Sequence, residues 1–283
     1  MVGGSVIAVL SNDEAKAVEI AERLGKREGK EEGVFYRRRE GAVRTVLVPR
    51  RGDLLKAAES LTLSTYYYLY VGEINAEAAE LALLASASGV PGRAMALDAA
   101  AFRKYFGELG LEPGEFEEVD RQPEDLGYVY VEKAFNVRGV GPVAIGLAYT
   151  GVKVHDKLVA LPSGAEVDVK SIQVLDEDQE EVAPGARVGL ALRGIEADQL
   201  KEAYALVKKG VPLRDRLKAV KLKWAAETDR AHAFLGGIKA LAAVKGQEAA
   251  LDRKIPATLR RGVLVNVNAK PRTPRVYGYL EAP

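Results

Sequence analysis

The sequence contains no cysteine and only two histidines, His155 and His232. Without thiols the chain can form neither a disulfide nor a thiolate metal site, and the lack of cysteine is typical of a cytosolic protein. Two histidines with no cysteine also argue against a metal centre built from these ligands. We therefore expect no metal, no cofactor and a cytoplasmic location.

Long apolar runs are also missing. No stretch approaches the roughly 18 residues that span a bilayer, and residues 1–10 lack the basic start of a secretory signal. Lys and Arg number 41 and Asp and Glu number 40, so the formal net charge is only +1. This balance predicts no membrane partner and no bulk attraction to nucleic acid, so any such binding must use local patches.

The first part of the chain, to about residue 120, alternates strand and helix patterns. Residues 6–10 form a continuous apolar run, typical of a strand buried on both faces. An S-x-x-E capping box at Ser11 and Glu14 then predicts the start of an amphipathic helix. The pattern predicts further strands at 43–48, 66–71 and 93–97 and further helices at 53–63, 76–88 and 98–109. This repetition favours a parallel α/β sheet.

The most specific pattern lies in residues 135–194. Short β-type runs alternate there with Gly, Pro and Asp turns, as in a small closed barrel. The spacing F-N-V-R-G-x-G-x-V-x-x-G begins at Phe135 and is followed by S-I-Q at residues 171–173 and R-V-G-L at residues 187–190. This pattern resembles the second domain of translational GTPases, both EF-Tu-type and SelB-like elongation factors. It is most similar to the SelB-like group, including the paralogues called pyrrolysine-specific elongation factor.

The resemblance implies a fold of α/β plus all-β type with three domains. It places a P-loop GTPase-like α/β domain at residues 1–122 and a translation-factor domain II-like β-barrel at residues 123–203. A domain III-like β-barrel follows at residues 204–283.

The GTPase-like domain lacks the nucleotide motifs that the resemblance predicts. Where G-x-x-x-x-G-K-[ST] should follow the first strand, residues 11–18 read S-N-D-E-A-K-A-V, with no glycine and two acidic residues. Where D-x-x-G is expected, residues 49–52 read P-R-R-G, and where N-K-x-D is expected, residues 98–101 read D-A-A-A. We therefore expect that this domain does not hydrolyse GTP and is not an enzyme.

The second domain of the resembled family contacts the acceptor end of aminoacyl-tRNA and the ribosome. The resemblance therefore implies a module that faces RNA, with Gln173 as a candidate nucleic-acid-binding residue. Asp176 stands where the bacterial tRNA-carrying relatives place a basic residue, which does not favour capture of a tRNA end. The alternative is that Gln173 has only a structural role, because it lies in a predicted strand.

Basic residues recur in the third domain and predict a stripe that neutralises RNA phosphates in a salt-dependent, sequence-tolerant way. Trp224 beside them is expected to lie in the core. The alternative is that the lysines protect an edge strand from pairing with other chains. The candidate nucleic-acid-binding residues are Arg214, Arg216, Lys218, Lys221, Lys223, Arg260 and Arg261.

Two further basic runs, residues 37–39 and residues 50–51, lie in the region where the nucleotide motifs are missing. One interpretation is a surface for RNA phosphates or for an acidic partner. The other is a solvated loop face that is balanced by Glu28, Glu31 and Glu32.

The function hypothesis is a SelB-like homologue without GTP binding that binds tRNA or the ribosome through its β-barrels. One alternative is an atypical factor that still binds GTP through other contacts. A second is a protein-docking module for a translation factor or synthetase. An α/β hydrolase finds little support, because no G-x-S-x-G, H-E-x-x-H or paired acid–base motif accompanies the strands.

Overall fold

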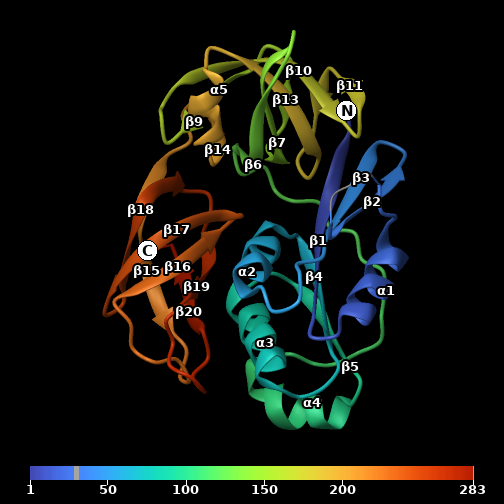
Figure 1. Cartoon of the computed structure of the whole chain (residues 1–283), viewed down its shortest axis with the longest axis vertical. Coiled ribbons are helices and arrows are strands. Elements are labelled where there is room, and N and C mark those ends of the chain that lie inside the picture. The colour runs from blue at the N-terminus through green and yellow to red at the C-terminus, as the bar shows by residue number, and fades with distance from the viewer. Residues whose placement is uncertain (29–31, 283) are drawn as a thin grey trace.

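The computed structural model describes residues 1–28 and 32–282. Figure 1 shows three units: an α/β unit at lower right, a β-rich middle unit at the top and a closed β-barrel at the left. An irregular connector, residues 110–127, leads from the α/β unit to the middle unit. The predicted α/β plus all-β fold is confirmed.

The first unit is a sheet of order β2-β3-β1-β4-β5 with helices between its strands. β1 pairs in parallel with β3 and β4, and β4 with β5, whereas β2 is antiparallel to β3. The predicted parallel core is therefore confirmed. The elements are β1 (Gly3–Ser11), α1 (Glu14–Leu24), β2 (Val34–Arg39), β3 (Ala42–Leu47), α2 (Leu54–Leu63), β4 (Tyr66–Val71), α3 (Ala76–Ser88), β5 (Gly92–Ala96), α4 (Ala99–Phe106) and the 3-10 turn η1 (Gly107–Leu109).

Side-chain caps start all four of these helices. Asp13 caps α1, Asp53 caps α2, Asn75 caps α3 and Asp98 caps α4, each accepting a backbone N–H from the first turn. The predicted capping box at Ser11 is therefore wrong by two residues. Ser11 instead accepts a hydrogen bond from the backbone N–H of Asp13 at 2.9 Å, which positions the true cap.

The segment that contains Arg37, Arg38 and Arg39 is the edge strand β2, and the expectation of a loop there is wrong. It forms a hairpin with β3, in which Gly41 takes the positive φ of 69° that the tight turn requires. Three successive arginines suggest a solvated loop, but alternate side chains of an edge strand reach opposite sides and find separate partners.

The middle unit is a sheet that closes on itself. β10 pairs with β13 and also with β9, so the path β10-β13-β7-β6-β14-β9 returns to its start. The elements are β6 (Tyr128–Val137), β7 (Gly141–Tyr149), β8 (Val152–Lys153), β9 (Lys157–Leu161), β10 (Glu166–Val174), β11 (Glu177–Gln179), β12 (Glu181–Val182), β13 (Arg187–Arg193), α5 (Ala197–Lys201) and β14 (Ala205–Lys208). The predicted second-domain barrel thus has the closed form that its turn pattern indicated.

The last strand of the middle unit, β14, follows the predicted boundary between residues 203 and 204. Its pairing with β6 and β9 places it inside the middle sheet rather than in the third unit. By strand pairing, the middle unit therefore extends to Lys208.

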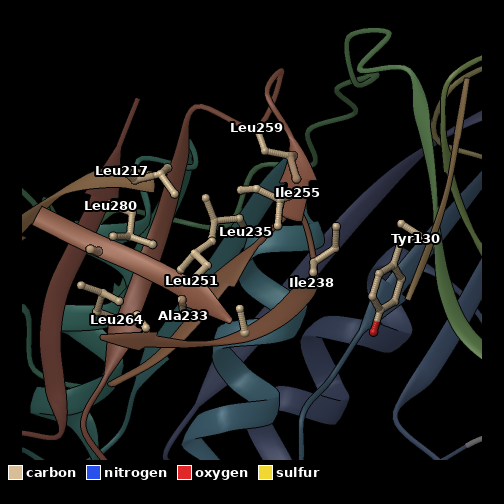
Figure 2. Packing of buried hydrophobic residues seen from close by; sticks show 14 of the residues in the cluster. Tyr130, Leu217, Ala233, Leu235, Ile238, Leu251, Ile255, Leu259, Leu264 and Leu280 are labelled. Carbon is tan, nitrogen blue, oxygen red and sulfur yellow. The ribbon is translucent and has the colours of Figure 1, made fainter. Parts of the chain in front are cut away.

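The third unit is a closed barrel of order β15-β18-β17-β16-β19-β20. Its core is built from small and branched apolar side chains, several of which Figure 2 shows, including Leu217, Leu235 and Leu280. Two of its strands, β16 and β18, have few β-branched or aromatic residues and therefore show little β signal in the sequence. The strands are β15 (Leu213–Lys221), β16 (Arg230–Leu235), β17 (Ile238–Lys245), β18 (Glu248–Pro256), β19 (Arg261–Val265) and β20 (Val276–Glu281).

Buried hydroxyl groups tie the three units together. The Tyr149 hydroxyl of the middle unit donates to the backbone oxygen of Leu63 at the end of α2. Its neighbour Tyr128, whose ring stacks on Tyr149 at 5.1 Å, donates to the backbone oxygen of Gly236 in the third barrel at 3.0 Å. Because burial raises the pKa of Tyr128 and Tyr149 above the ordinary value, both hydroxyls remain neutral donors at neutral pH.

Candidate nucleic-acid interface

The carboxyl ends of the parallel strands form the edge at which open α/β sheets bind ligands. β1 ends at Ser11 and α1 begins at Glu14, so only Asn12 and Asp13 connect them. A phosphate loop needs a longer glycine-rich segment here, whose backbone N–H groups surround the phosphates. In this chain the Asp13 carboxylate accepts the backbone N–H of Lys16 at 3.0 Å and itself occupies the helix N-terminus.

Asn12 holds this short connection against the neighbouring one. Its buried side chain accepts the backbone N–H of Gly72 at 2.9 Å and donates to the backbone oxygen of Glu73 at 2.7 Å. The amide thus ties the end of β1 to the segment that follows β4. Both residues of the connection therefore have structural partners.

The second motif position, the loop before α2, is closed by an ion pair. The Arg51 guanidinium lies 3.0 Å from the Glu77 carboxylate, which also accepts the backbone N–H of Gly52 at 2.8 Å. Cavities of about 20 Å³ and about 420 Å³ border this loop, and a groove of about 810 Å³ also reaches Arg51 and Glu14. At the third position, the Asp98 carboxylate accepts the backbone N–H groups of Ala100 and Ala101 and caps α4.

The arginines of β2 are paired with carboxylates. Arg37 and Arg39 bond Glu118 of the connector at 2.8 Å and 2.5 Å, and Arg38 bonds Glu177 of the middle unit at 2.5 Å. Of the acidic residues predicted to balance them, Glu28 lies 3.7 Å from Arg38 and Glu32 pairs with Arg50, while Glu31 lies outside the described residues. These pairs favour the balanced face over a free basic surface.

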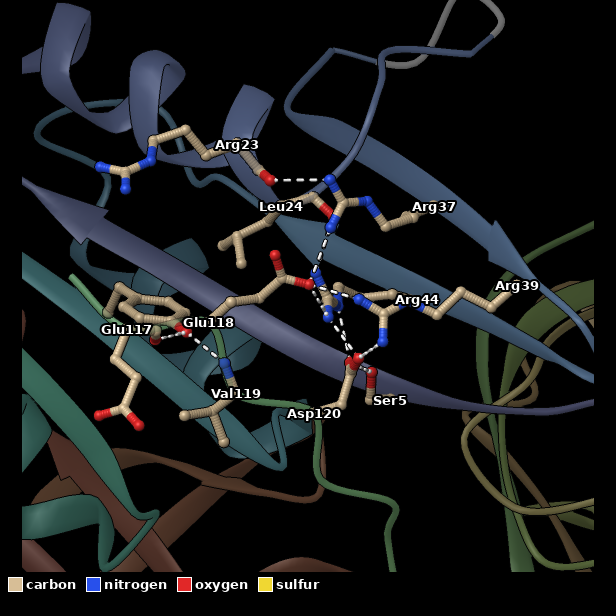
Figure 3. A network of polar contacts seen from close by, with 11 residues as sticks. Ser5, Arg23, Leu24, Arg37, Arg39, Arg44, Glu117, Glu118, Val119 and Asp120 are labelled. Carbon is tan, nitrogen blue, oxygen red and sulfur yellow. Dashed lines mark hydrogen bonds and ion pairs between the residues drawn. The ribbon is translucent and has the colours of Figure 1, made fainter.

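A buried arginine fastens the connector to the first sheet (Figure 3). Arg44 of β3 donates to Asp120 at 2.7 Å, to Glu118 at 2.8 Å and to the backbone oxygen of Leu24 at 3.0 Å. Ser5 donates to the same Asp120 at 2.8 Å. Burial by itself raises the pKa of both carboxyls, but the hydrogen bonds and charge of Arg44 outweigh it, so both pKa values lie below the ordinary range.

The predicted basic stripe of the third barrel does not form one face. Leu217 and Ala219 point into the core, so Lys218 points outward, and Lys221, three residues further, does not share that face. Lys218 lies in register between Glu248 of β18 and Glu281 of β20. Carboxylates on both neighbouring strands thus flank this exposed lysine.

The other residues of the predicted stripe have different partners, and two of them have none among the described residues. Lys221 pairs with Glu227 and Lys223 with Glu108 of η1. Arg214 donates to the backbone oxygen of Ala257 and Arg261 pairs with Glu281 at 2.8 Å, whereas Arg216 and Arg260 have no ion pair or side-chain hydrogen bond with any described residue. The expectation that Trp224 lies in the core is wrong, because 41% of it is exposed and the Lys223 ammonium lies 4.5 Å from its ring centre.

The middle unit presents a different surface, which we call the barrel face, on the outside of β6, β7, β13 and β10. Strand register builds it from two rows of outward side chains. Inward neighbours such as Leu190 and Ala144 are in the core, which fixes the outward direction of the rows. One row is Gln173, Gly189, Ile145 and Lys133, and the next is Ser171, Ala191, Val143 and Phe135.

The barrel face has few charged side chains among its two rows. Phe135 is 37% exposed, and a Cβ added at Gly189 would meet no atom within 4 Å, so the middle of the face is open. Lys170 lies beside it and donates to the backbone oxygen of Val140 at 3.1 Å, which holds the β6–β7 hairpin tip. An exposed aromatic ring on a sheet, with lysines near, is an arrangement that stacks on nucleic-acid bases.

A groove of about 810 Å³ runs from the barrel face toward the first unit. Lys133 and Leu147 line it on the middle unit and Lys56 and Glu59 on α2. The Tyr130 hydroxyl donates to Glu59 at 3.1 Å across the groove. Burial, together with the charge of Glu59, raises the pKa of Tyr130, so this hydroxyl also stays protonated.

Of the predicted residues, only Gln173 lies on the barrel face, where its amide donates to Asp178 of β11 at 2.9 Å. Asp176 lies off the face, in the two-residue turn between β10 and β11, with a positive φ of 64°. Phe135 and Lys133 were not predicted as site residues. The outward alternation of K-A-F at residues 133–135 was the signal that could have identified them.

Other site types find no support in residues 1–28 and 32–282. No cluster of three potential metal ligands occurs in these ranges. His155 lies exposed in a turn, with its Nδ1 4.0 Å from Asp168. None of the described helices has the length and hydropathy needed to cross a bilayer.

Comparison with known proteins places this architecture among translation elongation factors. No family model matches the chain. In sequence, it is 39% identical over 72 residues to elongation factor 1-alpha of Picrophilus torridus, which covers 25% of this chain and 17% of that protein. It is also 38% identical over 89 residues to an uncharacterized protein of Methanocaldococcus jannaschii, covering 31% of this chain and 29% of the relative.

Elongation factors of the SelB type are also similar to this chain. The selenocysteine-specific elongation factor of M. jannaschii is 39% identical over 85 residues, covering 30% of this chain and 18% of the relative. SelB from Methanococcus maripaludis in its apo form matches the whole chain with a TM-score of 0.72 at 17% identity, covering 80% of that structure. A bacterial selenocysteine-specific factor, EF-Sec, gives a TM-score of 0.75 at 15% identity over the whole chain and 58% of its own length.

The predicted resemblance to SelB-like elongation factors is therefore confirmed, in fold over the whole chain and in sequence over a quarter to a third of it. The matched segments span less than a third of the length of the curated relatives. SelB from M. maripaludis has also been solved in complex with the GTP analogue GPPNHP, at a TM-score of 0.72 and 15% identity.

Proposed function

We propose that this protein is a cytoplasmic SelB-like translation factor homologue that has lost GTP binding and hydrolysis and binds tRNA or ribosomal RNA through its barrels. The barrel face carries the RNA part of the proposal. It combines an exposed aromatic ring, an open centre at Gly189 and flanking lysines, and it belongs to the unit with the most specific family pattern.

The short β1–α1 connection supports the loss of the nucleotide. A polyphosphate at this helix N-terminus would meet the Asp13 carboxylate, with Glu14 next to it, instead of free backbone N–H groups. The Arg51–Glu77 pair occupies the position from which a magnesium ligand would come. Like charge therefore acts against a bound nucleoside triphosphate.

Thermal unfolding with GTP or GDP and magnesium tests this part. A ligand at 100 times its Kd raises the free energy of unfolding by about 2.7 kcal/mol, which is readily detected as an increase in Tm. We expect no change in Tm. A nucleotide-dependent increase would restore the alternative of an atypical GTP-binding factor.

Filter binding of purified protein to bulk tRNA and to ribosomes, across a salt series, tests the RNA part. We expect retention at low salt that weakens as salt is added, because phosphate contacts release counterions. If neither RNA is retained at low salt, the proposal fails.

Protein docking through the first unit is the second candidate. Leu97, which is 73% exposed after β5, and Tyr105, which is 60% exposed on α4, are large exposed side chains of the first unit that such docking would use. Substituting both residues by serine would abolish docking to a purified translation factor without changing retention of tRNA.

A further inference from the structure

A pocket of about 280 Å³ lies in the first unit, at the end of the sheet where the parallel strands begin. Tyr67 near the start of β4 and Gly92 at the start of β5 line it, together with the C-terminal end of α3 and residues 109–112. We call it the Tyr67 pocket. It lies at the opposite end of the strands from the edge at which open α/β sheets bind nucleotides, and neither barrel contributes to it.

The hydroxyl of Tyr67 is a buried polar group that the chain does not use. Only 3% of Tyr67 is exposed, yet its hydroxyl has no hydrogen-bond partner among the described residues. The next residue, Tyr68, belongs to the core on the other side of the sheet, where its hydroxyl donates to the backbone oxygen of Glu117 at 2.7 Å and accepts the backbone N–H of Val119 at 2.9 Å. A buried phenol usually finds such partners. The Tyr67 hydroxyl is therefore available to a ligand.

The Tyr67 side chain is held in place at the pocket. Unlike the hydroxyl of Thr45, which is fully enclosed without a partner, the Tyr67 hydroxyl keeps accessible surface, and it lies on the side chain that lines the pocket. The ring packs directly on the backbone of Gly92, where a Cβ would lie 2.4 Å from three ring atoms. Only a glycine leaves this space, so the donor is positioned before any ligand binds.

The negative groups around the pocket already have cationic partners. Glu112 is the one charged side chain among its lining residues, and it lies 3.3 Å from Arg103. At the negative end of the α3 dipole, Arg261 donates to the backbone oxygen of Ala87 at 3.1 Å. Burial raises the pKa of Tyr67 to about 12, so its hydroxyl is neutral at neutral pH. A charged ligand would lose its hydration here without gaining a counter-charge.

Apolar side chains form much of the remaining wall. Ala85 and Val90 line the pocket on one side and Leu111 on the other. The Ser86 hydroxyl donates to the backbone oxygen of Leu109 at 2.8 Å and ties the end of α3 to the 3-10 turn. The pocket therefore presents an apolar surface with one free hydroxyl, which suits an uncharged ligand with an apolar body and one polar group.

We propose that the Tyr67 pocket binds a small uncharged molecule with an apolar body and an amide-type carbonyl, which accepts a hydrogen bond from the Tyr67 hydroxyl. The volume of the pocket corresponds to about nine groups the size of a water molecule, enough for one ring with a short polar substituent. Such a ligand would replace water at the hydroxyl and bury its ring against the apolar wall.

Calorimetric titration of the full chain with benzamide, benzoate and benzamidine tests the proposal, because these probes share one shape and differ in charge. Benzamide is neutral and carries the carbonyl, benzoate is an anion and benzamidine is a cation. We expect benzamide to bind with a Kd of about 1 mM, in line with its few atoms. Each charged probe should bind at least about tenfold more weakly.

Two neighbouring tyrosines supply the variant and its matched control. Tyr67→Phe removes only the hydroxyl and should weaken benzamide binding about fivefold. Its Tm should not fall, because no described residue bonds to that hydroxyl. Tyr68→Phe removes two hydrogen bonds on the other side of the sheet, so its Tm should fall while its affinity for benzamide stays within about twofold.

Three outcomes would each overturn the proposal: equal affinities for benzamide and benzoate, unchanged benzamide binding in Tyr67→Phe, or no heat of binding at about 10 mM benzamide. The last result would mean that water alone occupies the pocket. The barrel face does not enter this argument. A variant of Phe135 and Lys133 should therefore lose tRNA retention and keep benzamide binding, so the two proposals can fail separately.

Discussion

The middle unit and the third barrel are both closed β-sheets, yet their outer surfaces differ in kind. The third barrel is richer in cations, but its exposed Lys218 lies between Glu248 and Glu281, and Lys221 and Lys223 are each paired. The barrel face carries few charges and leaves Phe135 exposed. Strand register, more than the number of basic residues, therefore determines which cations lie opposite carboxylates of neighbouring strands.

The largest expected effect comes from the barrel face. Phe135→Ala with Lys133→Ala removes a stacking ring, which contributes about 1–3 kcal/mol per base, and a cation beside it. We expect tRNA affinity to fall about a hundredfold, measured by filter binding at one salt concentration. An unchanged affinity with folded protein would remove the distinction between the two surfaces.

The connector leads to the middle unit, and the bonds of Arg44 attach it to the first sheet. Arg44→Met leaves the carboxylates of Glu118 and Asp120 without their buried cation, and each is about one-third exposed. We expect a loss of about 2 kcal/mol in the free energy of unfolding, measured in urea, less than for a fully buried pair because water screens these carboxylates. Arg103→Met, which breaks the exposed pair with Glu112, is the matched control and should cost less than about 0.5 kcal/mol. Equal costs for the two variants would contradict the role of Arg44.

The same cluster gives the stability a pH dependence with a definite sign. The pKa values of Glu118 and Asp120 are lowered in the folded protein, so their contribution is complete above the unfolded-state pKa, near 4. It is lost as the pH falls through the folded-state pKa values. The free energy of unfolding should therefore decrease below about pH 4, and it should decrease less in Arg44→Met than in the natural sequence.

A substitution that adds one negative charge tests the same comparison. Gly189→Glu places a carboxylate on the open centre of the barrel face, where no neighbouring atom obstructs the new Cβ. We expect about a tenfold loss of tRNA affinity from repulsion of phosphates, with little change in Tm. A large fall in Tm would show that the position is not open, and full tRNA affinity would place the RNA elsewhere.

The smallest effect is expected on the third barrel. Arg216→Ala and Lys218→Ala should each change tRNA affinity by less than about twofold, with a slightly shallower salt dependence. A loss as large as that of the Phe135 variant would reinstate the predicted basic stripe and reverse the comparison.

The sequence predicted the first unit well, because buried strands and amphipathic helices leave strong periodic patterns. The apolar face of α1 is buried as expected, and α3 matches its predicted bounds. The predicted N-cap at Ser11 was wrong. Ser11 and Asp13 are both suitable cap residues, and only the geometry of the turn decides between them.

The candidate site was less predictable. Gln173 was found through a motif, but its row partners Gly189 and Ile145 come from two other strands. Cross-strand register depends on bulges such as the one between Val131 and Lys133, which no local pattern indicates. Most of the carboxylates near the cations of the third barrel are likewise distant in sequence, although Glu227 lies only six residues from Lys221.

The two-residue connection of Asn12 and Asp13 limits how a phosphate-binding loop could form at this position. Substitutions alone cannot rebuild a phosphate-binding loop there, because two residues cannot supply the length that such a loop needs. An insertion would have to arise in the same step in which Asn12 gives up its bonds to Gly72 and Glu73. An intermediate that lost these two bonds would lose a link between β1 and the segment after β4, so the short connection opposes the formation of a phosphate-binding loop.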